Sequence, residues 1–157
     1  MSHVPRRLLA LCTLFALTFA FAACGSDDTK ATNEYVSQVN AIQNEVATQF
    51  RAAGGAISPT SSVASDKQAL TRFDQAVTSA TAKLKAVKAP GKVATLHADL
   101  VKAVDSYHAS IGAARRALSA KTQAGINKAQ GTFASGTAET SATITTTIDA
   151  INRKLHE

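Results

Sequence analysis

Apolar residues recur at steps of three and four along most of the chain beyond residue 31, which is the spacing of one face of an α-helix. Four such stripes are separated by turn residues. The helices that they predict span about residues 32–53, 66–88, 92–119 and 122–156. Four single-faced stripes joined by short turns close most simply as an antiparallel, up-down four-helix bundle, so we predict an all-α fold.

Local signals mark the ends of the first two predicted helices. Thr32 or Asn33 can cap the first helix with a side-chain oxygen. Residues 56–64 are rich in Ser and Thr and lack periodicity, which predicts an exposed connection. Ser65 followed three residues later by Gln68 fits a capping box, so the second helix is expected to begin there.

The third and fourth helices differ in the quality of their patterns. Residues 92–119 form the longest clean stripe, and we expect one uninterrupted helix at the centre of the core. In the fourth, Gly125, Gly131 and Gly136 each cost up to about 1 kcal/mol relative to alanine, although small residues permit close packing. The β-branched run 143–147 would suit a strand, but a lone strand would have no partner in this chain, so helix is predicted.

The first 23 residues follow another pattern. Arg6 and Arg7 precede residues 8–23, which carry no charge, and small residues follow. A basic start, an apolar middle and small residues at a cleavage point are typical of an export signal. The uncharged run is shorter than the about 20 residues that span a bilayer as a helix. We therefore predict that residues 1–23 are a signal peptide.

A cysteine ends this apolar run. The last four residues of the signal region are Phe21, Ala22, Ala23 and Cys24. This quartet resembles the lipobox of bacterial lipoproteins. The resemblance implies that Cys24 is diacylated, with chains such as palmitate, and becomes the new N-terminus, followed by a flexible tether over residues 24–31. The protein would then be held on the outer face of the cell membrane or within the envelope. Residues 20–22 also fit ordinary secretory cleavage, and the alternative is a secreted soluble protein.

Composition narrows the possible partners of the exported chain. Loss of the signal peptide removes two arginines and leaves 15 Lys and Arg against 11 Asp and Glu, which favours anionic surfaces. The chain has no tryptophan and few aromatic residues, so it lacks the stacking platforms that bind single-stranded nucleic acid. Nucleic acid is not an expected partner. Cys24 is the one cysteine left, so no intramolecular disulfide can form.

The predicted topology brings basic residues toward the anchor. If the first helix starts at the membrane and the second returns, the turn at Pro90 and the C-terminus lie at the membrane end. Each basic residue near an anionic surface contributes about 1 kcal/mol. The residues predicted to contact anionic headgroups are Lys83, Lys85, Lys88, Lys92, Arg153 and Lys154. The far end is also basic, so charge alone does not choose between the ends.

Catalytic and metal-binding motifs are missing from the sequence. His97 and His108 lie on nearly one side of the third helix, but a rise of 1.5 Å per residue separates them by about 16 Å, too far for one metal ion. Asp105 and His108 could form a weak metal-binding or acid-base pair, or an ordinary surface pair worth a few tenths of a kcal/mol. Arg115 and Arg116 could bind a phosphate or a carboxylate. We expect no enzyme activity, no cofactor and no metal.

Two functions fit these features. The first is a membrane-anchored, non-enzymatic lipoprotein that acts as a helical interaction or accessory module, with membrane lipid and an unidentified envelope protein as partners. The second is an extracytoplasmic bundle that binds a small ligand between its helices. A buried pocket of about 300 Å³ or more, lined by Leu, Val and Phe with a few converging polar groups, would favour the second function. A tightly filled bundle would favour the first.

Overall fold

A computed structural model describes residues 27–54, 61–120 and 122–157 of the chain. The elements are α1 (Asp27–Gly54), α2 (Val63–Ala86), the short 3-10 helix η2 (Gly91–Val93), α3 (Ala94–Asp105), α4 (Tyr107–Leu118) and α5 (Gln123–His156). These ranges contain helices and turns but no strand, so the all-α prediction is confirmed for the described residues. None of the described helices is long and apolar enough to cross a membrane. The predicted signal peptide and Cys24 lie outside the described residues.

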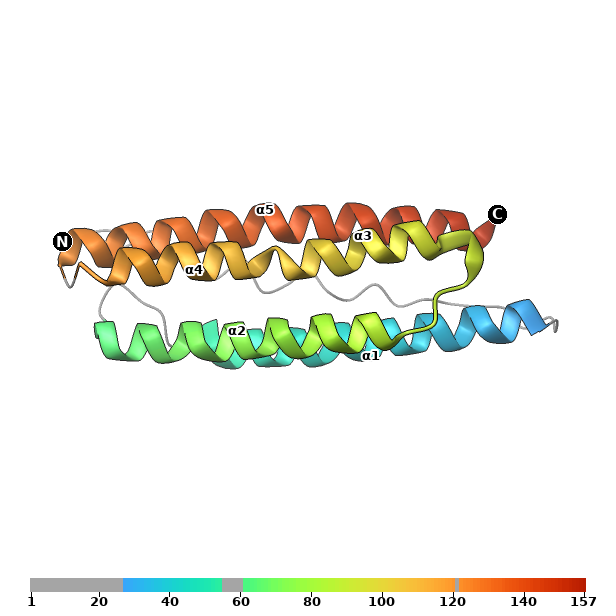
Figure 1. Cartoon of the computed structure of the whole chain (residues 1–157), viewed down its shortest axis with the longest axis horizontal. Helices are drawn as coiled ribbons and strands as arrows, with labels where there is room; N and C mark the ends of the chain where they lie inside the picture. The colour runs from blue at the N-terminus through green and yellow to red at the C-terminus, as the bar shows by residue number, and fades with distance from the viewer. Residues whose placement is uncertain (1–26, 55–60, 121) are drawn as a thin grey trace, which may run out of the picture.

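The helices form two antiparallel hairpins that lie side by side (Figure 1). α1 and α2 form one hairpin, and α3 with α4, which follow one another along one line, pack against α5 in the other. The hairpins meet where α2 packs on α3 and α4. The start of α1, η2 and the C-terminus of α5 lie at the same end, and we call it the η2 end. The up-down order is therefore the predicted one.

The apolar stripes supply the core as the sequence predicts. Burying one such side chain fully contributes about 1.5–3 kcal/mol. The large buried residues include Tyr35, Val39, Ile42, Leu70, Phe73, Val77, Leu84, Leu100, Val104, Tyr107, Ile111, Leu118, Ile144, Ile148, Ile151 and Leu155. Tyr107 points its ring inward, and its hydroxyl lies 2.8 Å from Ser141 Oγ, where either atom can donate.

The first helix begins earlier than the sequence suggested. α1 starts at Asp27, so the stretch 24–31 is helical from that residue and is not an extended tether along its whole length. Thr32 is buried within the helix and does not cap it. Residues 27–31 contain neither proline nor glycine, so nothing in them stops the helix before Thr32.

The second helix is capped one turn before the expected position. Its N-cap is Ser62, whose hydroxyl accepts a hydrogen bond from the backbone nitrogen of Ser65 at 3.1 Å. Asp66 lies in the first turn, almost completely buried, and accepts a hydrogen bond from the Ser61 hydroxyl. The capping box predicted at Ser65 and Gln68 is therefore wrong, because an earlier serine satisfies the free backbone groups.

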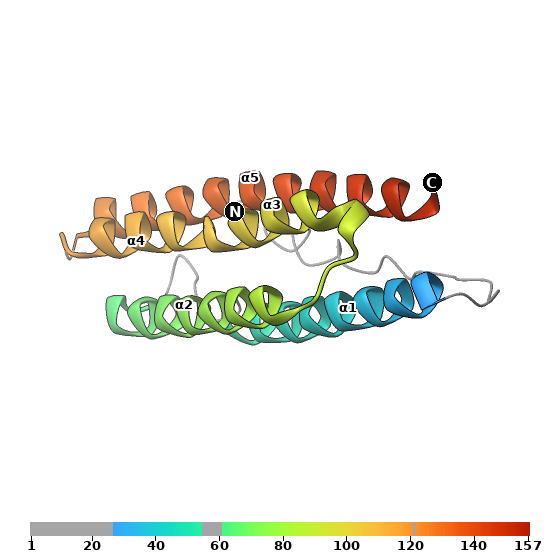
Figure 2. The ribbon, with the colours of Figure 1, turned by 45° about the vertical axis from the view of Figure 1, so that its right-hand side comes forward.

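The predicted third helix is divided. Residues 91–93 form η2, and Ser106 separates α3 from α4. The Ser106 hydroxyl donates to the Ala103 carbonyl oxygen at 2.7 Å and lies 3.3 Å from Thr140 Oγ1. A serine that bonds back to its own helix commonly bends it. The apolar periodicity survives this break because α3 and α4 remain nearly in line (Figure 2).

The fourth predicted helix is continuous. α5 includes residues 143–147, and its threonine hydroxyls donate to carbonyl oxygens four residues earlier, as Thr143 does to Glu139 at 3.1 Å. That bond lets threonine remain in a helix. A β-carbon added at Gly136 would lie 2.8 Å from Ser110 Cβ, whereas one added at Gly131 would have nothing within 4 Å. The expected close packing therefore occurs at Gly136 and not at Gly131.

Candidate functional site: an apolar groove between two helices

One seam of the bundle is not closed by helix packing. Each of the other neighbouring pairs is in firm contact, namely α1 with α2, α2 with α3 and α4, and these two with α5. α1 and α5, the first and last helices, pack least closely. Along their seam lies an open groove of about 690 Å³, which we call the α1–α5 groove. Its size falls within the range of small-molecule sites.

The walls of the α1–α5 groove come from the two helices that flank it. The α1 wall consists of Ile42, Gln43, Val46, Ala47, Phe50 and Arg51. The α5 wall includes Phe133, Ala134, Thr137, Ala138, Ser141 and Ala142. The alanines on α5 have short side chains that do not fill the space toward α1, so the seam stays open although both helices carry apolar stripes. The sequence stripes include Val46 and Phe50 as core residues, and both are only partly buried.

The floor of the groove is the core surface of the other helices. It includes Phe73, Val77, Leu84, Leu100, Val104 and Tyr107. Edge-to-face aromatic contacts order one end of it: the Phe50 ring centroid lies 4.8 Å from that of Phe73 and 5.3 Å from that of Tyr107. Phe73 also contacts Phe133, at 4.9 Å. Such pairs add about 0.5–1.5 kcal/mol each beyond burial, so this end of the groove is well ordered.

Two polar atoms of the walls have no partner among the described residues. Gln43 Nε2 on α1 and Thr137 Oγ1 on α5 are both buried and make no hydrogen bond there. A buried polar group without a hydrogen bond is destabilising by about 1–3 kcal/mol. The groove thus combines apolar surface with a wall amide and a wall hydroxyl that lack partners among the described residues. Neither residue lies in a sequence motif for ligand binding.

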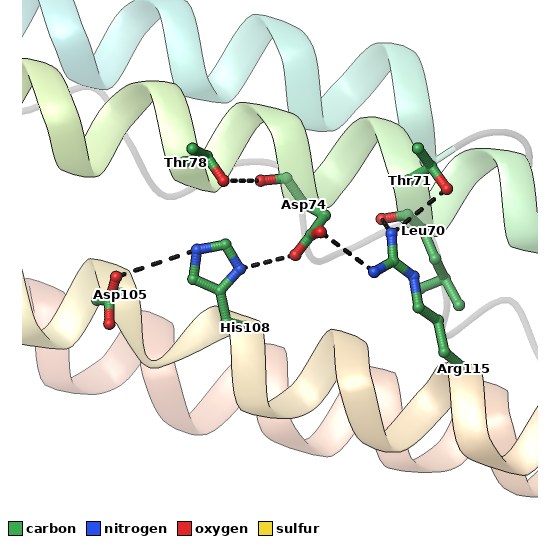
Figure 3. Close-up of polar contacts among 7 residues, drawn as sticks. All are labelled: Leu70, Thr71, Asp74, Thr78, Asp105, His108 and Arg115. Atoms are coloured by element: carbon green, nitrogen blue, oxygen red, sulfur yellow. Dashed lines mark hydrogen bonds and ion pairs between the residues drawn. The ribbon is translucent and has the colours of Figure 1, made fainter.

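A polar cluster on the opposite side of the bundle joins α2 to α4 (Figure 3). Asp74 Oδ1 lies 2.7 Å from His108 Nδ1, and Asp74 Oδ2 accepts a hydrogen bond from Arg115 Nη1 at 3.1 Å. Asp105 Oδ1 lies 4.0 Å from His108 Nε2. The predicted pair Asp105 and His108 is therefore only a distant contact, and the closer partner of His108 is Asp74, which spacing along one helix could not reveal.

Electrostatics favour an ionised Asp74. Burial raises the pKa of Asp74, but hydrogen bonds from His108 and Arg115 and the charges of both outweigh it, and the pKa lies below its usual value. Arg115 thus binds a carboxylate, as one sequence alternative proposed, and the carboxylate belongs to the chain itself. The cluster ties the two hairpins together.

Metal coordination is not supported at this cluster. Both ring nitrogens of His108 already face carboxylates, and no group of three or more His, Cys, Asp or Glu that could hold a metal ion occurs within the described residues. His97, the other histidine of interest, is buried elsewhere. Its Nε2 donates to the Leu84 carbonyl oxygen at 3.0 Å, so its Nδ1 accepts from the Tyr35 hydroxyl at 3.2 Å.

Several of the predicted headgroup residues already have partners within the chain. Lys83 lies in the last turn of α2, two residues before Lys85, and its Nζ pairs with Glu45 at 2.5 Å. Lys92 lies at the η2 end, where its Nζ donates to the Leu155 carbonyl oxygen at 2.9 Å. Lys154 pairs with Glu157 there at 2.5 Å.

The remaining predicted headgroup residues follow from their place in the chain. Lys85 lies in the last turn of α2, Lys88 lies in the connection to η2, and Arg153 lies in the last turn of α5. Together with Lys83 and Lys92 they lie toward the η2 end.

Comparisons with known proteins add no identity. No protein-family model, no curated protein sequence and no solved structure matches the chain.

Proposed function

We propose that the protein is a lipid-anchored, non-enzymatic binding protein outside the cytoplasm that holds an apolar small molecule in the α1–α5 groove. The observation that carries this proposal is the groove itself: about 690 Å³ of open space over apolar residues, with unpaired polar atoms in its walls. This volume lies within the about 300–1,000 Å³ of small-molecule sites, and the space is a groove open to solvent on one side and not the buried pocket that the sequence criterion named. A bundle that worked only through its exterior would gain stability by filling this space.

The dimensions of the groove indicate an elongated ligand. On α2 the floor runs from Phe73 to Leu84, about 16 Å at 1.5 Å per residue. A carbon chain with bonds of about 1.5 Å and angles of about 111° extends roughly 1.25 Å per carbon. A chain of about twelve or thirteen carbons therefore matches the floor. Each methylene buried there contributes about 0.8 kcal/mol.

Anchoring through Cys24 is supported by the lipobox-like residues and by the topology. The N-terminus of α1 lies at the η2 end, close to Lys92 and the last residues of α5. Acylation would hold this end near a membrane and leave the α1–α5 groove some distance from the surface. The intact mass of the N-terminal peptide from the native product tests the anchor: a diacylated Cys24 supports it, and an unmodified N-terminus contradicts it.

Titration with the neutral apolar dye Nile red tests the groove. The substitution Cys24→Ser removes the acylation site from the full chain. As this variant is added, the fluorescence of the dye should rise and then saturate. Ala138→Phe places a ring in the groove and should weaken dye binding at least about ten-fold. Ala109→Phe, an exposed alanine of α4 outside the groove, is the matched control and should leave binding unchanged.

Two results would contradict the proposal. Equal dye binding by both phenylalanine variants would place the dye elsewhere on the surface. A dimer in sedimentation that Ala138→Phe dissociates and Ala109→Phe does not would assign the groove to a second copy of the chain.

A further inference from the structure

We infer that the ligand of the α1–α5 groove is an anionic amphiphile whose headgroup binds at Arg51 and Thr137 and whose tail points toward the η2 end. This inference rests on the proposed function and names the chemical class of the ligand. It follows from the charges, the unpaired atoms and the order of residues along the groove.

Arg51 gives the groove its sign of charge. It is the one charged side chain among the described residues that line the groove, and no acidic residue lines it. Arg51 makes no ion pair with another described residue. Its Nε donates to the Ala47 carbonyl oxygen at 3.1 Å, and its Nη2 contacts Thr48 Oγ1 at 3.5 Å, both within α1. The guanidinium therefore retains donors for an external carboxylate or phosphate, which it binds in bidentate fashion.

Thr137 lies at the same end of the groove as Arg51. The aromatic contacts described above place Phe50 level with the part of α5 between Phe133 and Ser141, and Thr137 is the middle of that segment. Arg51 follows Phe50 directly. The hydroxyl of Thr137 is buried and has no partner among the described residues, and rotation of the side chain would let it donate to a headgroup oxygen from the α5 side. Arg51 and Thr137 thus lie at one end of the groove on opposite walls.

The rest of the groove suits the tail. From Phe50 toward the η2 end the lining is uncharged and mainly aliphatic, with Ile42 on α1, Leu84 on α2, Leu100 on α3 and Ile144 on α5, and its polar members there are Gln43, Thr145 and Thr146. These residues carry no charge, so a headgroup placed there would lose its hydration without gaining a counter-ion. The polar end of the ligand is therefore expected at Arg51, and the apolar end at Ile42.

Displacement of Nile red from the Cys24→Ser full chain tests this inference, with laurate and dodecyltrimethylammonium as probes at pH 8 and below their micelle concentrations. The two probes share one tail length and differ in the sign of the headgroup. Laurate should bind more tightly. Arg51→Gln should weaken laurate binding about three- to five-fold, which is the effect of losing one exposed ion pair, and should not weaken binding of the cationic probe. Arg72→Gln, an exposed arginine outside the groove, should change neither affinity.

Thr137→Val separates a binding role from a structural one. Valine matches threonine in shape, and the hydroxyl that it removes has no partner among the described residues. The variant should keep or raise the stability of the bundle and lower laurate affinity about three-fold. A merely structural role would lower stability and affect both probes equally.

The outcomes distinguish the two proposals. If neither probe displaces the dye and Ala138→Phe leaves the affinity for the dye unchanged, the proposed function itself fails. If both probes bind at the groove with equal affinity, or if Arg51→Gln weakens both alike, the groove remains a binding site and the anionic headgroup is refuted. Tighter binding of the cationic probe also refutes it.

Discussion

The contact between α4 and α5 positions the α5 wall of the groove, and two glycines of α5 test it as a pair. Replacing glycine by alanine inside a helix stabilises it by about 0.5–1 kcal/mol when the new methyl group has room. At Gly131 nothing lies within 4 Å of the added β-carbon. Gly131→Ala should therefore raise the free energy of unfolding by about that amount.

The same substitution at Gly136 should have the opposite effect. Its β-carbon would lie 2.2 Å from Ser110 Oγ, 2.8 Å from Ser110 Cβ and 3.7 Å from Ser110 Cα. The hydroxyl can rotate away, but the β-carbon of Ser110 belongs to α4, and ordinary carbon contacts lie at about 3.5–4.0 Å. The two helices must separate by roughly 1 Å, and overpacking of this kind costs about 1–3 kcal/mol. Gly136→Ala should lower the free energy of unfolding by about 1–2 kcal/mol.

Urea unfolding followed by circular dichroism measures both changes. The double variant Gly136→Ala with Ser110→Gly removes the clashing β-carbon, so the cycle should show a favourable coupling of about 1–2 kcal/mol. Equal stabilisation by alanine at Gly131 and Gly136, or a coupling near zero, would refute this account of the α4–α5 contact.

Three further predictions follow from named contacts. Asp74→Asn should lower the free energy of unfolding by about 1 kcal/mol near neutral pH. This value is small because solvent screens the cluster, in which Asp74, His108 and Arg115 are 33, 36 and 37% exposed. Since the pKa of Asp74 is lowered in the folded state, urea titrations should show the difference above pH 4, and it should disappear as the pH falls through the folded-state pKa. Burial raises the pKa of Tyr35 to about 12 from 10.0, so the free energy of unfolding of the wild type should fall by up to about 2.7 kcal/mol between pH 10 and 12. A Tyr35→Phe variant whose free energy of unfolding falls just as much would contradict this. Arg153→Gln should weaken binding of the Cys24→Ser chain to acidic vesicles at low salt about five-fold, whereas Arg72→Gln, in the middle of α2, should not, and equal effects would place the membrane contact elsewhere.

Periodicity predicted the helices because the core-facing residues of a bundle must recur every three or four positions. Tyr35, Leu70, Ile111 and Ile148 are buried as that pattern requires. The errors fell at helix ends and at Ser106, where single hydrogen bonds decide and several nearby residues can make them. Ser62 and not Ser65 caps α2, for example.

The groove could not be predicted from the sequence. Val46, Phe50 and Phe133 fit apolar stripes as well as any core residue, and only the packing of two helices distant in sequence leaves them at an open seam. The pairing of His108 with Asp74 was missed for a similar reason, since the two residues are 34 positions apart on different helices. Periodicity identifies the face of each helix but not how closely opposite faces approach.

The location of a bound apolar molecule tests the central claim most directly. A long-chain hydrocarbon carrying a diazirine can be photo-crosslinked to the full Cys24→Ser chain, and the labelled peptides can be mapped by mass spectrometry. The α1–α5 groove predicts label within residues 42–51 of α1 and 133–146 of α5, with both signals lost in Ala138→Phe and retained in Ala109→Phe. Label spread over exposed faces, or label concentrated near Asp74 on the opposite seam, would contradict the claim that this bundle binds its ligand between its first and last helices.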